Sequence, residues 1–272
     1  MTESSQAPGP PNRQGPPAIA VRDLWMTFPG QQAGKEVRVL ERINVEVQPG
    51  EFVCFVGPSG CGKTTLLNIV AGFLRPTSGD VLVEGSPVQE PDPRRIFIFQ
   101  EGGIFPWLTV RDNVAFGLAP KSSSERQRIV AHYVDMVGLT GFEGAYPRQL
   151  SGGMRQRVEL ARALAASPEI IYMDEPFGAL DYFVRLKMRA DLVRIWQRER
   201  KTVLFVTHDI DEAIQLADRI VVLSSRPATI QLVVAIDLPR PRDPDSSPYL
   251  RTSAQILGAM GVSLRNGRED DK

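Results

Sequence analysis

The sequence predicts an α/β fold with a mostly parallel sheet, and three observations carry this prediction. Apolar runs of strand length alternate with segments of helical periodicity along much of the 272-residue chain. A glycine-rich loop of the phosphate-binding type directly follows one of these runs, Phe52–Val56. Another run, Ile170–Met173, ends in two adjacent carboxylates, and the carboxyl ends of parallel strands are where such sheets place their ligands.

Two strands are expected ahead of the glycine-rich loop. Ile19–Leu24 and Val37–Val47 alternate apolar with polar residues, as strands do when one face is covered. We therefore expect a β-rich N-terminal region, from which Gln48, Pro49 and Gly50 turn the chain into the strand Phe52–Val56.

The loop after this strand is a complete G-x-x-x-x-G-K-[ST] motif. It reads Gly57-Pro58-Ser59-Gly60-Cys61-Gly62-Lys63-Thr64-Thr65. Glycine accepts positive φ angles, so backbone N–H groups can turn around a phosphate, and the helix expected from Thr64 to Gly72 directs its N-terminus at the same anion. Lys63 would meet the outer phosphates and the Thr64 hydroxyl would ligate Mg²⁺. The alternative is a plain glycine-rich turn.

Strands are next expected at Asp80–Glu84 and Arg95–Phe99, the second ending at Gln100. From about residue 102 to 168 the pattern becomes helical and predicts an inserted α-helical subdomain. One helix there begins with the capping-box pattern Ser122-x-x-Glu125. Its buried face is expected to carry Ile129, Tyr133, Met136 and Val137.

A further helix is expected to begin at Ser151, followed by Gly152 and Gly153. A hydroxyl and free N–H groups at a helix start can form a second anion site, although this pattern alone is usually a plain cap or turn. The buried side of this helix is expected to carry Met154, Val158, Ala161 and Ala165.

Asp174 and Glu175 follow the strand Ile170–Met173. Asp174 can hold Mg²⁺ through water, and Glu175 can orient and polarise an attacking water molecule. The alternative, a solvated acidic strand end, weakens when a phosphate-binding loop lies upstream. A long helix from about Asp181 to Arg200 and strands at Thr202–Thr207 and Ile220–Leu223 complete the pattern.

Composition excludes several classes of protein. Lys plus Arg and Asp plus Glu are equal at 32 each, so no basic bias indicates a nucleic-acid partner. Two cysteines are too few for a disulfide framework, and no apolar run approaches the roughly 20 residues that cross a bilayer.

With these motifs in this order, the chain resembles the ATP-binding subunits of ABC transporters from about Ile19 to Asp237. The resemblance implies the ABC ATPase fold, a P-loop NTPase core with a mostly parallel sheet, an N-terminal antiparallel β subdomain and an inserted α-helical subdomain. We expect a disordered tail at 1–17, the ATPase domain at 18–240 and a C-terminal extension at 241–272.

The resemblance also implies roles for three single residues and two short loops. Phe28 matches the aromatic residue that stacks on adenine, and Gln100 matches the glutamine that touches Mg²⁺ and the water. The signature loop corresponds to Ser151, Gly152 and Gly153, and Ala179-Leu180-Asp181 corresponds to the loop that crosses the dimer interface. His208 matches the histidine that contacts the γ-phosphate.

In that family two subunits sandwich two ATP molecules, so a second ATPase subunit is implied, and we expect it to be a second copy of this chain in a homodimer. Integral-membrane permease subunits are implied as well, together with an extracytoplasmic substrate-binding protein reached indirectly. The expected location is the cytoplasmic face of the membrane. The chain departs from the family pattern at Met154, where glutamine is commonest, and at Gly178, where serine often stands.

Finer resemblance points to importers of nitrate, sulfonates and taurine. It is carried by four segments: 99–110, 151–157, 175–181 and 238–242. In the first, Pro106-Trp107-Leu108 could line a groove for a cytoplasmic helix of the permease, the alternative being an internal apolar cluster. The rival functions are a soluble ABC ATPase of assembly, repair or translation, an exporter, and a stand-alone P-loop kinase or GTPase.

Overall fold

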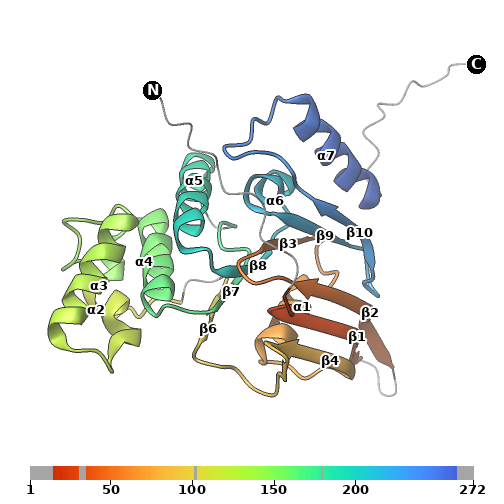
Figure 1. Ribbon diagram of the computed structural model, residues 1–272, viewed down its shortest axis with the longest axis horizontal. Helices are drawn as coiled ribbons and strands as arrows, with labels where there is room; N and C mark the ends of the chain where they lie inside the picture. Colours follow the sequence, from red (N-terminus) through yellow and green to blue (C-terminus); the bar gives the residue numbers. More distant parts are fainter. Residues whose placement is uncertain (1–14, 31–34, 101–102, 179, 262–272) are drawn as a thin grey trace, which may run out of the picture.

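The computed structural model describes residues 15–30, 35–100, 103–178 and 180–261, and it contains two β-sheets with helices around them (Figure 1). The first sheet is antiparallel, with strand order β2-β1-β4-β5. Its strands are β1 (Ile19–Pro29), β2 (Glu36–Val47), β4 (Ser78–Val83) and β5 (Ser86–Pro87).

The second sheet has the order β10-β9-β3-β8-β7-β6. Its strands are β3 (Phe52–Val56), β6 (Arg95–Ile98), β7 (Ile170–Asp174), β8 (Thr202–Val206), β9 (Arg219–Leu223) and β10 (Ile230–Ala235). Neighbouring strands run parallel except β10, which pairs antiparallel with β9. A mostly parallel sheet beside an N-terminal antiparallel one confirms the predicted fold class.

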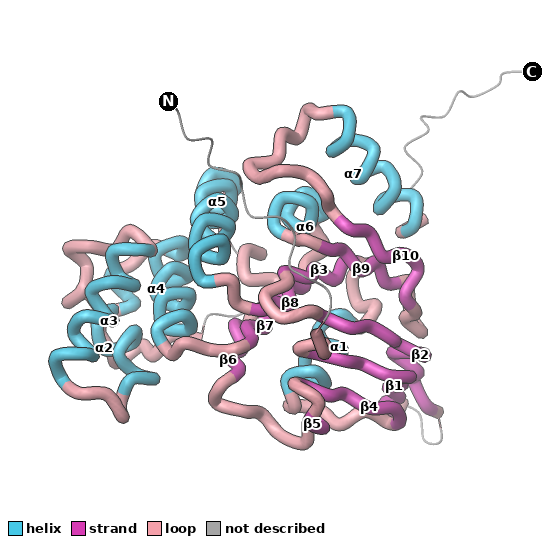
Figure 2. The backbone as a smooth tube through the Cα atoms, viewed as in Figure 1, coloured by secondary structure: helices cyan, strands magenta, loops and turns pink. Residues whose placement is uncertain are grey.

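Seven α-helices lie in the described part of the chain (Figure 2). They are α1 (Lys63–Ala71), α2 (Val110–Ala115), α3 (Ser123–Met136), α4 (Gly152–Ala165), α5 (Tyr182–Glu199), α6 (Ile210–Leu216) and α7 (Ser247–Ala259). No helix among the described residues is both long and apolar enough to span a bilayer.

The central strand β3 divides the molecule into two cores because its side chains alternate between the two faces of the sheet. Val53 and Phe55 join the core shared with α1 and the antiparallel sheet. Phe52, Cys54 and Val56 join the core on the other face, which includes residues of α4, α5 and α6. All five side chains are buried, which explains why this strand reads as a continuous apolar run.

Helices lie between residues 102 and 168 as predicted, but the buried face of α3 differs from the predicted one. Val130, Tyr133, Val134 and Val137 are buried, whereas Ile129 and Met136 only border the core. The predicted capping box is half formed.

At this cap Ser122 Oγ accepts the Glu125 N–H at 3.3 Å, but the Glu125 carboxylate pairs with Lys121 at 2.7 Å. In α4, Val158, Ala161 and Ala165 are buried as expected, while Met154 is half-buried and only borders the core.

Two elements lie beyond the predicted ones. The edge strand β10 and the helix α7 follow β9, and α7 buries Tyr249 and Ile256. The N-terminal tail up to residue 14 and the segment after residue 261 lie outside the described residues.

Candidate functional site

The phosphate-binding loop joins the end of β3 to the start of α1, as its motif predicts. Gly60 and Gly62 adopt φ angles of 71° and 120°, which side chains would disfavour. A Cβ at Gly57 would lie 2.9 Å from the Leu223 carbonyl oxygen, and one at Gly62 would lie 2.8 Å from Val39. The glycines are therefore required by backbone conformation at two positions and by close approach of neighbouring strands at two.

This loop forms one wall of a cavity of about 430 Å³. The lining residues are Phe28, Val39, Ser59, Gly60, Gly62, Lys63, Thr64, Thr65, Gln100, Glu175 and Arg226. Nine of the residues singled out from the sequence thus meet in one hollow, although they come from β1, the loop, the end of β6 and the end of β7. Gly57, Pro58, Cys61, Asp174 and His208 lie outside this lining, and Cys61 is buried.

Lys63 lies almost fully buried against the loop that precedes it. Its Nζ donates to the carbonyl oxygens of Gly57 at 2.9 Å and Pro58 at 3.0 Å. This ammonium group borders the cavity and forms no ion pair with a carboxylate among the described residues, although its charge opposes the rise in the pKa of Asp174, so the site favours an anion.

Thr64 and Asp174 come together from the first turn of α1 and the end of β7. The Thr64 hydroxyl donates to Asp174 Oδ1 at 3.1 Å. Burial raises the pKa of Asp174 above its ordinary value, and the adjacent Glu175 adds to that rise, while the Thr64 hydroxyl opposes it. Thus two oxygen donors 110 residues apart in sequence face one point next to the phosphate-binding loop.

These oxygens fit Mg²⁺, which takes oxygen ligands and usually keeps waters and substrate phosphates in its shell. No group of three or more His, Cys, Asp or Glu side chains that could enclose a metal occurs in the described part of the chain. A hydroxyl and a carboxylate beside a phosphate site match a metal that is held jointly by protein and nucleotide.

Glu175 reaches the cavity and is held there from the neighbouring strand. Its N–H donates to the Val206 carbonyl at 2.9 Å, its φ is 44°, and its Oε2 lies 3.0 Å from His208 Nδ1. The His208 side chain is 60% exposed, against 20% for that of Glu175. A carboxylate in this setting can accept a proton from a water molecule in the cavity while the imidazole fixes its orientation.

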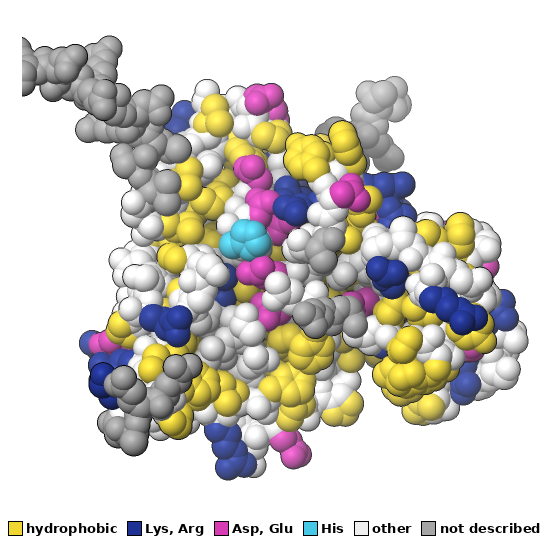
Figure 3. All heavy atoms as spheres, turned by 180° about the vertical axis from the view of Figure 1, so that it is seen from behind, with side chains coloured by type: hydrophobic (Ala, Val, Ile, Leu, Met, Phe, Trp, Pro, Cys, Tyr) yellow, Lys and Arg dark blue, Asp and Glu magenta, His cyan; other side chains and the backbone are white. Residues whose placement is uncertain are grey.

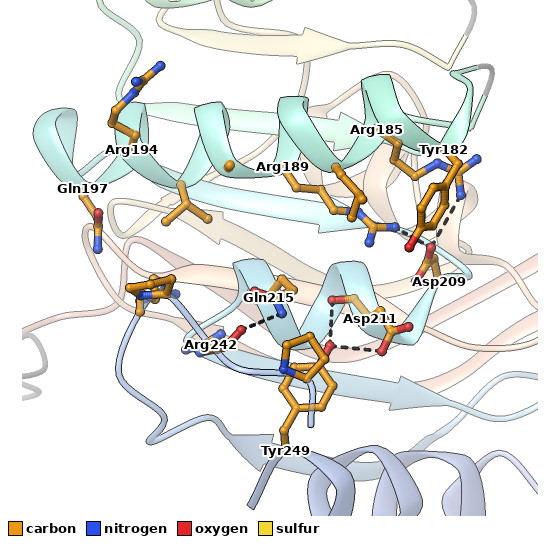
Figure 4. A pocket seen from close by; sticks show the side chains of 16 residues that line it. Tyr182, Arg185, Arg189, Arg194, Gln197, Asp209, Asp211, Gln215, Arg242 and Tyr249 are labelled. Atoms are coloured by element: carbon orange, nitrogen blue, oxygen red, sulfur yellow. Dashed lines mark hydrogen bonds and ion pairs between the residues drawn. The ribbon is translucent and has the colours of Figure 1, made fainter. Parts of the chain in front are cut away.

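The loop that carries His208 is anchored by a network between α5, α6 and α7, around a second cavity of about 560 Å³ (Figure 4). Asp209 caps α6 and accepts a hydrogen bond from Arg189, which also donates to Glu212 at 2.9 Å. Tyr249 of α7 donates to Asp211 at 3.0 Å. The network explains why the position after His208 is an aspartate, which the sequence left without a role.

Arginines that line this second cavity are occupied by internal partners. Arg240 pairs with Asp218 at 2.9 Å, and Arg194 pairs with Asp191 at 2.7 Å. Arg242 donates to backbone carbonyls, including that of Ala217 at 2.7 Å, and burial lowers its pKa to about 10. We therefore interpret the second cavity as the place where α5, α6 and the segment leading to α7 pack together.

The predicted second anion site lies apart from the first cavity. Ser151 caps α4 by accepting the Met154 N–H at 3.2 Å, and Ser151 and Gly152 are exposed. A Cβ at Gly153 would lie only 2.4 Å from Val184, in the first turn of α5. Asp181 caps that helix, accepting the Val184 N–H at 3.0 Å. Ser151, Gly153 and Asp181 therefore share one region, and none of them lines the cavity with Lys63.

An exposed aromatic cluster lies beyond Gln100, on the helical part of the molecule. The Phe105 ring lies 5.4 Å from Trp107 and 4.4 Å from Phe116, and the Arg162 guanidinium lies 4.8 Å from the centre of the Phe105 ring. Trp107 is 69% exposed. Hydrophobic side chains also gather on this lobe in the view from behind, at its right (Figure 3).

Two residues of the cavity lining, Val39 and Arg226, were missed by the sequence reasoning. Val39 belongs to β2, and Arg226 follows β9 in the turn toward β10. No local motif marks either one, because they reach the loop only through the pairing of distant segments. Ala179, predicted at the dimer interface, lies outside the described residues.

Residues 40–178 match the family model described as ABC transporter. The chain is 50% identical over 252 residues to a putative ATP-binding protein of Brucella abortus, covering 92% of this chain and 91% of that protein. It is 48% identical to a nitrate import ATP-binding protein of Synechococcus elongatus, covering 85% and 87%. It is 45% identical to an aliphatic sulfonates import ATP-binding protein of Bacillus cereus, covering 88% and 94%.

A similar solved structure is a dimeric ATP-binding cassette in a post-hydrolysis state, bound to ADP and Pi. It superposes with a TM-score of 0.69 at 31% identity, covering 80% of this chain and 98% of the cassette.

Proposed function

Because the chain belongs to the ATP-binding proteins of the ABC transporter family, we propose that it energises a membrane importer of a small anionic solute. The solute would be of the nitrate, sulfonate or taurine type, as the names of the nitrate and sulfonate relatives suggest. The ATPase assignment rests on one arrangement. Asp174 accepts a hydrogen bond from the Thr64 hydroxyl, and Glu175 lines the cavity beside the phosphate-binding loop.

The proposed site binds ATP with the adenine ring on Phe28 and the phosphates in the loop around Lys63. Mg²⁺ would be held by Thr64, Gln100 and, through water, Asp174; when bound, it neutralises charge on the phosphate oxygens. Lys63 provides a fixed positive charge beside them. The remaining glycine-loop residues, apart from Pro58, which has no N–H, supply backbone N–H groups to the phosphates.

Glu175 acts in the proposed mechanism as the base that orients a water molecule toward the γ-phosphate. In the same mechanism His208 contacts the γ-phosphate and positions Glu175. The 3.0 Å contact between His208 Nδ1 and Glu175 Oε2 supports the second of these roles. Because the donors are held by strands and helix starts, little reorganisation is needed when charge develops on the phosphate.

A second copy of the chain is proposed to complete the site. Ser151, Gly152, Gly153 and Asp181 do not line the cavity of their own chain. Ser151 and the two glycines nevertheless offer N–H groups to an anion at the start of α4. In a dimer each copy would place these residues over the ATP held by the other, so ATP would join the two copies and hydrolysis would release them.

The permease is proposed to dock on the aromatic cluster of Phe105, Trp107 and Phe116. An exposed tryptophan beside two phenylalanines is typical of protein contact sites. In this proposal the chain acts at the cytoplasmic face of the membrane, and the extracytoplasmic substrate-binding protein acts on it only through the permease.

A tagged Glu175→Gln variant, trapped with ATP in solubilised native membranes, tests this proposal. We expect ATP binding to persist, hydrolysis to fall at least tenfold because a base is lost, and a dimer with a multi-helix permease to co-purify. Glu90→Gln, which changes an exposed glutamate outside the cavity lining, is the matched control. Wild-type turnover by Glu175→Gln would exclude Glu175 as base. Recovery of ribosomal, DNA-repair or assembly proteins alone would overturn the transport assignment.

A further inference from the structure

Arg226 is fixed beside the phosphate-binding loop by a turn that is anchored to the antiparallel sheet. Its neighbour Ala228 donates to the Val39 carbonyl at 2.8 Å and accepts the Glu41 N–H at 2.9 Å. Across the turn, Ser224 Oγ accepts the Thr229 N–H at 3.0 Å. The backbone that carries Arg226 is thus held between β9, β10 and β2, so its side chain starts from a defined place.

The Arg226 side chain reaches the crest of the loop. A Cβ at Gly60 would lie 3.3 Å from a guanidinium nitrogen of Arg226. The residue lines the cavity that contains Lys63 and Thr64. It also lines an adjoining cavity of about 590 Å³ next to Phe28 and Val39. The guanidinium therefore lies at Gly60 of the phosphate-binding loop, and Arg226 shares both cavities with Phe28, the proposed adenine contact.

This charge has no partner within the protein as far as the structure describes it. Arg226 is exposed, and no hydrogen bond or ion pair joins its guanidinium to another described residue. Glu175, the carboxylate among the described residues that line the first cavity, is engaged with His208, and Glu36, which lines the adjoining cavity, forms no ion pair with Arg226. Two cations, Lys63 and Arg226, therefore border one cavity, and an anion between them would relieve their mutual repulsion.

We propose that Arg226 donates hydrogen bonds to a phosphate of the bound nucleotide, on the side of the phosphate chain nearer Phe28. A guanidinium suits this task because its donors form a planar fork that matches two phosphate oxygens. The inference rests on the nucleotide site proposed above and adds a binding residue from outside the glycine-rich motif. The chemistry that Arg226 recognises is the phosphate charge, so adenosine would not engage it.

The test is equilibrium binding of ATP, ADP and adenosine to the purified full chain, with EDTA present so that ATP is not hydrolysed. Arg226→Ala should weaken ATP and ADP binding about tenfold, the size expected for a charge-assisted hydrogen bond at a partly exposed site, and leave adenosine unchanged. The salt dependence of ATP binding should become shallower. With Mg²⁺ restored, KM for ATP should rise while kcat stays within about twofold.

Arg75→Ala is the matched control because it removes the same charge from an exposed position outside the cavity lining. Arg226→Lys keeps the positive charge and Arg226→Gln removes it, so the pair separates the effect of charge from that of side-chain shape. Both variants also replace Arg226→Ala if thermal unfolding without ligand shows that the alanine variant does not fold. Lys should retain more ADP affinity than Gln.

Two results would overturn the proposal while the nucleotide site stands. One is equal ADP affinity in the Arg226 variants and Arg75→Ala. The other is an equal loss for adenosine and ADP, which would assign Arg226 to the base. If the wild-type chain bound no ATP at all, the proposed nucleotide site itself would fail, and Arg226 with it.

Discussion

Replacing Asn113 by alanine should loosen the loop that presents Trp107. Asn113 lies in α2 with no exposed surface. Its Oδ1 accepts the Phe105 N–H at 2.8 Å. Its Nδ2 lies 3.1 Å from the Phe105 and Leu108 carbonyl oxygens and 3.0 Å from that of Thr109. One side chain therefore closes the whole turn from 105 to 109 onto α2.

The magnitude follows from this geometry. An amide nitrogen has two hydrogens, so the four contacts amount to about three independent hydrogen bonds. At about 1 kcal/mol net for each, Asn113→Ala should lower the free energy of unfolding by about 3 kcal/mol. For a domain of this size that corresponds to a fall in Tm of roughly 6–12 °C.

Thermal unfolding and amide hydrogen exchange of the 105–109 segment measure this effect. Asn68→Ala is the control, since Asn68 is half-buried in α1 and its side chain makes no hydrogen bond to a described residue. ATP binding should be unchanged and capture of the permease weakened. A Tm within about 2 °C of wild type, with unchanged exchange at 105–109, would refute the reasoning.

Three further predictions concern the second anion site and one surface carboxylate. Gly153→Ala should cost about 1–3 kcal/mol because its Cβ would meet Val184 at 2.4 Å. Adding Val184→Ala should restore most of the loss, and Gly152→Ala, with its nearest contact at 3.9 Å, should be tolerated in a denaturant titration. Ser151→Ala should lower steady-state hydrolysis while ATP affinity of the monomer persists, and equal loss of both would contradict a role across the dimer. Hydrogen bonds from Arg94 lower the pKa of Asp92 to about 2, from an ordinary value near 3.8. Stability from Asp92 is thus present above about pH 4 and lost as pH falls toward 2, so Asp92→Asn should flatten the pH dependence of unfolding in that window.

Local patterns predicted most of the fold because the forces that set them are local. The buried run Phe52–Val56, the cap at Ser151 and the long helix after Asp181 each appear where periodicity and capping placed them. The edge strand β10 was missed because its side chains alternate between half-buried and exposed, which gives a weak signal. The helix α7, which buries only Tyr249 and Ile256, was also missed.

The candidate site was predictable where one segment carries its own chemistry. The glycine-rich loop and the Asp174–Glu175 pair are contiguous motifs, and their contact follows from parallel strands ending at one edge. Phe28 required the family resemblance, since a lone aromatic at a strand end is ordinary. Val39 and Arg226 could not be found from the sequence, because only the pairing of β2 with the turn after β9 brings them to the loop.

The left-handed backbone of Glu175 has a consequence for how this site can change. A φ of 44° is disfavoured for a residue with a side chain, and conformations of this kind cost about 1 kcal/mol or more. Glycine adopts this backbone conformation without that cost, so selection for stability alone would favour glycine at this position. If Glu175 is the proposed base, replacing it by glycine would relieve the backbone strain and remove the base together, so the chain would gain thermal stability and lose ATP hydrolysis.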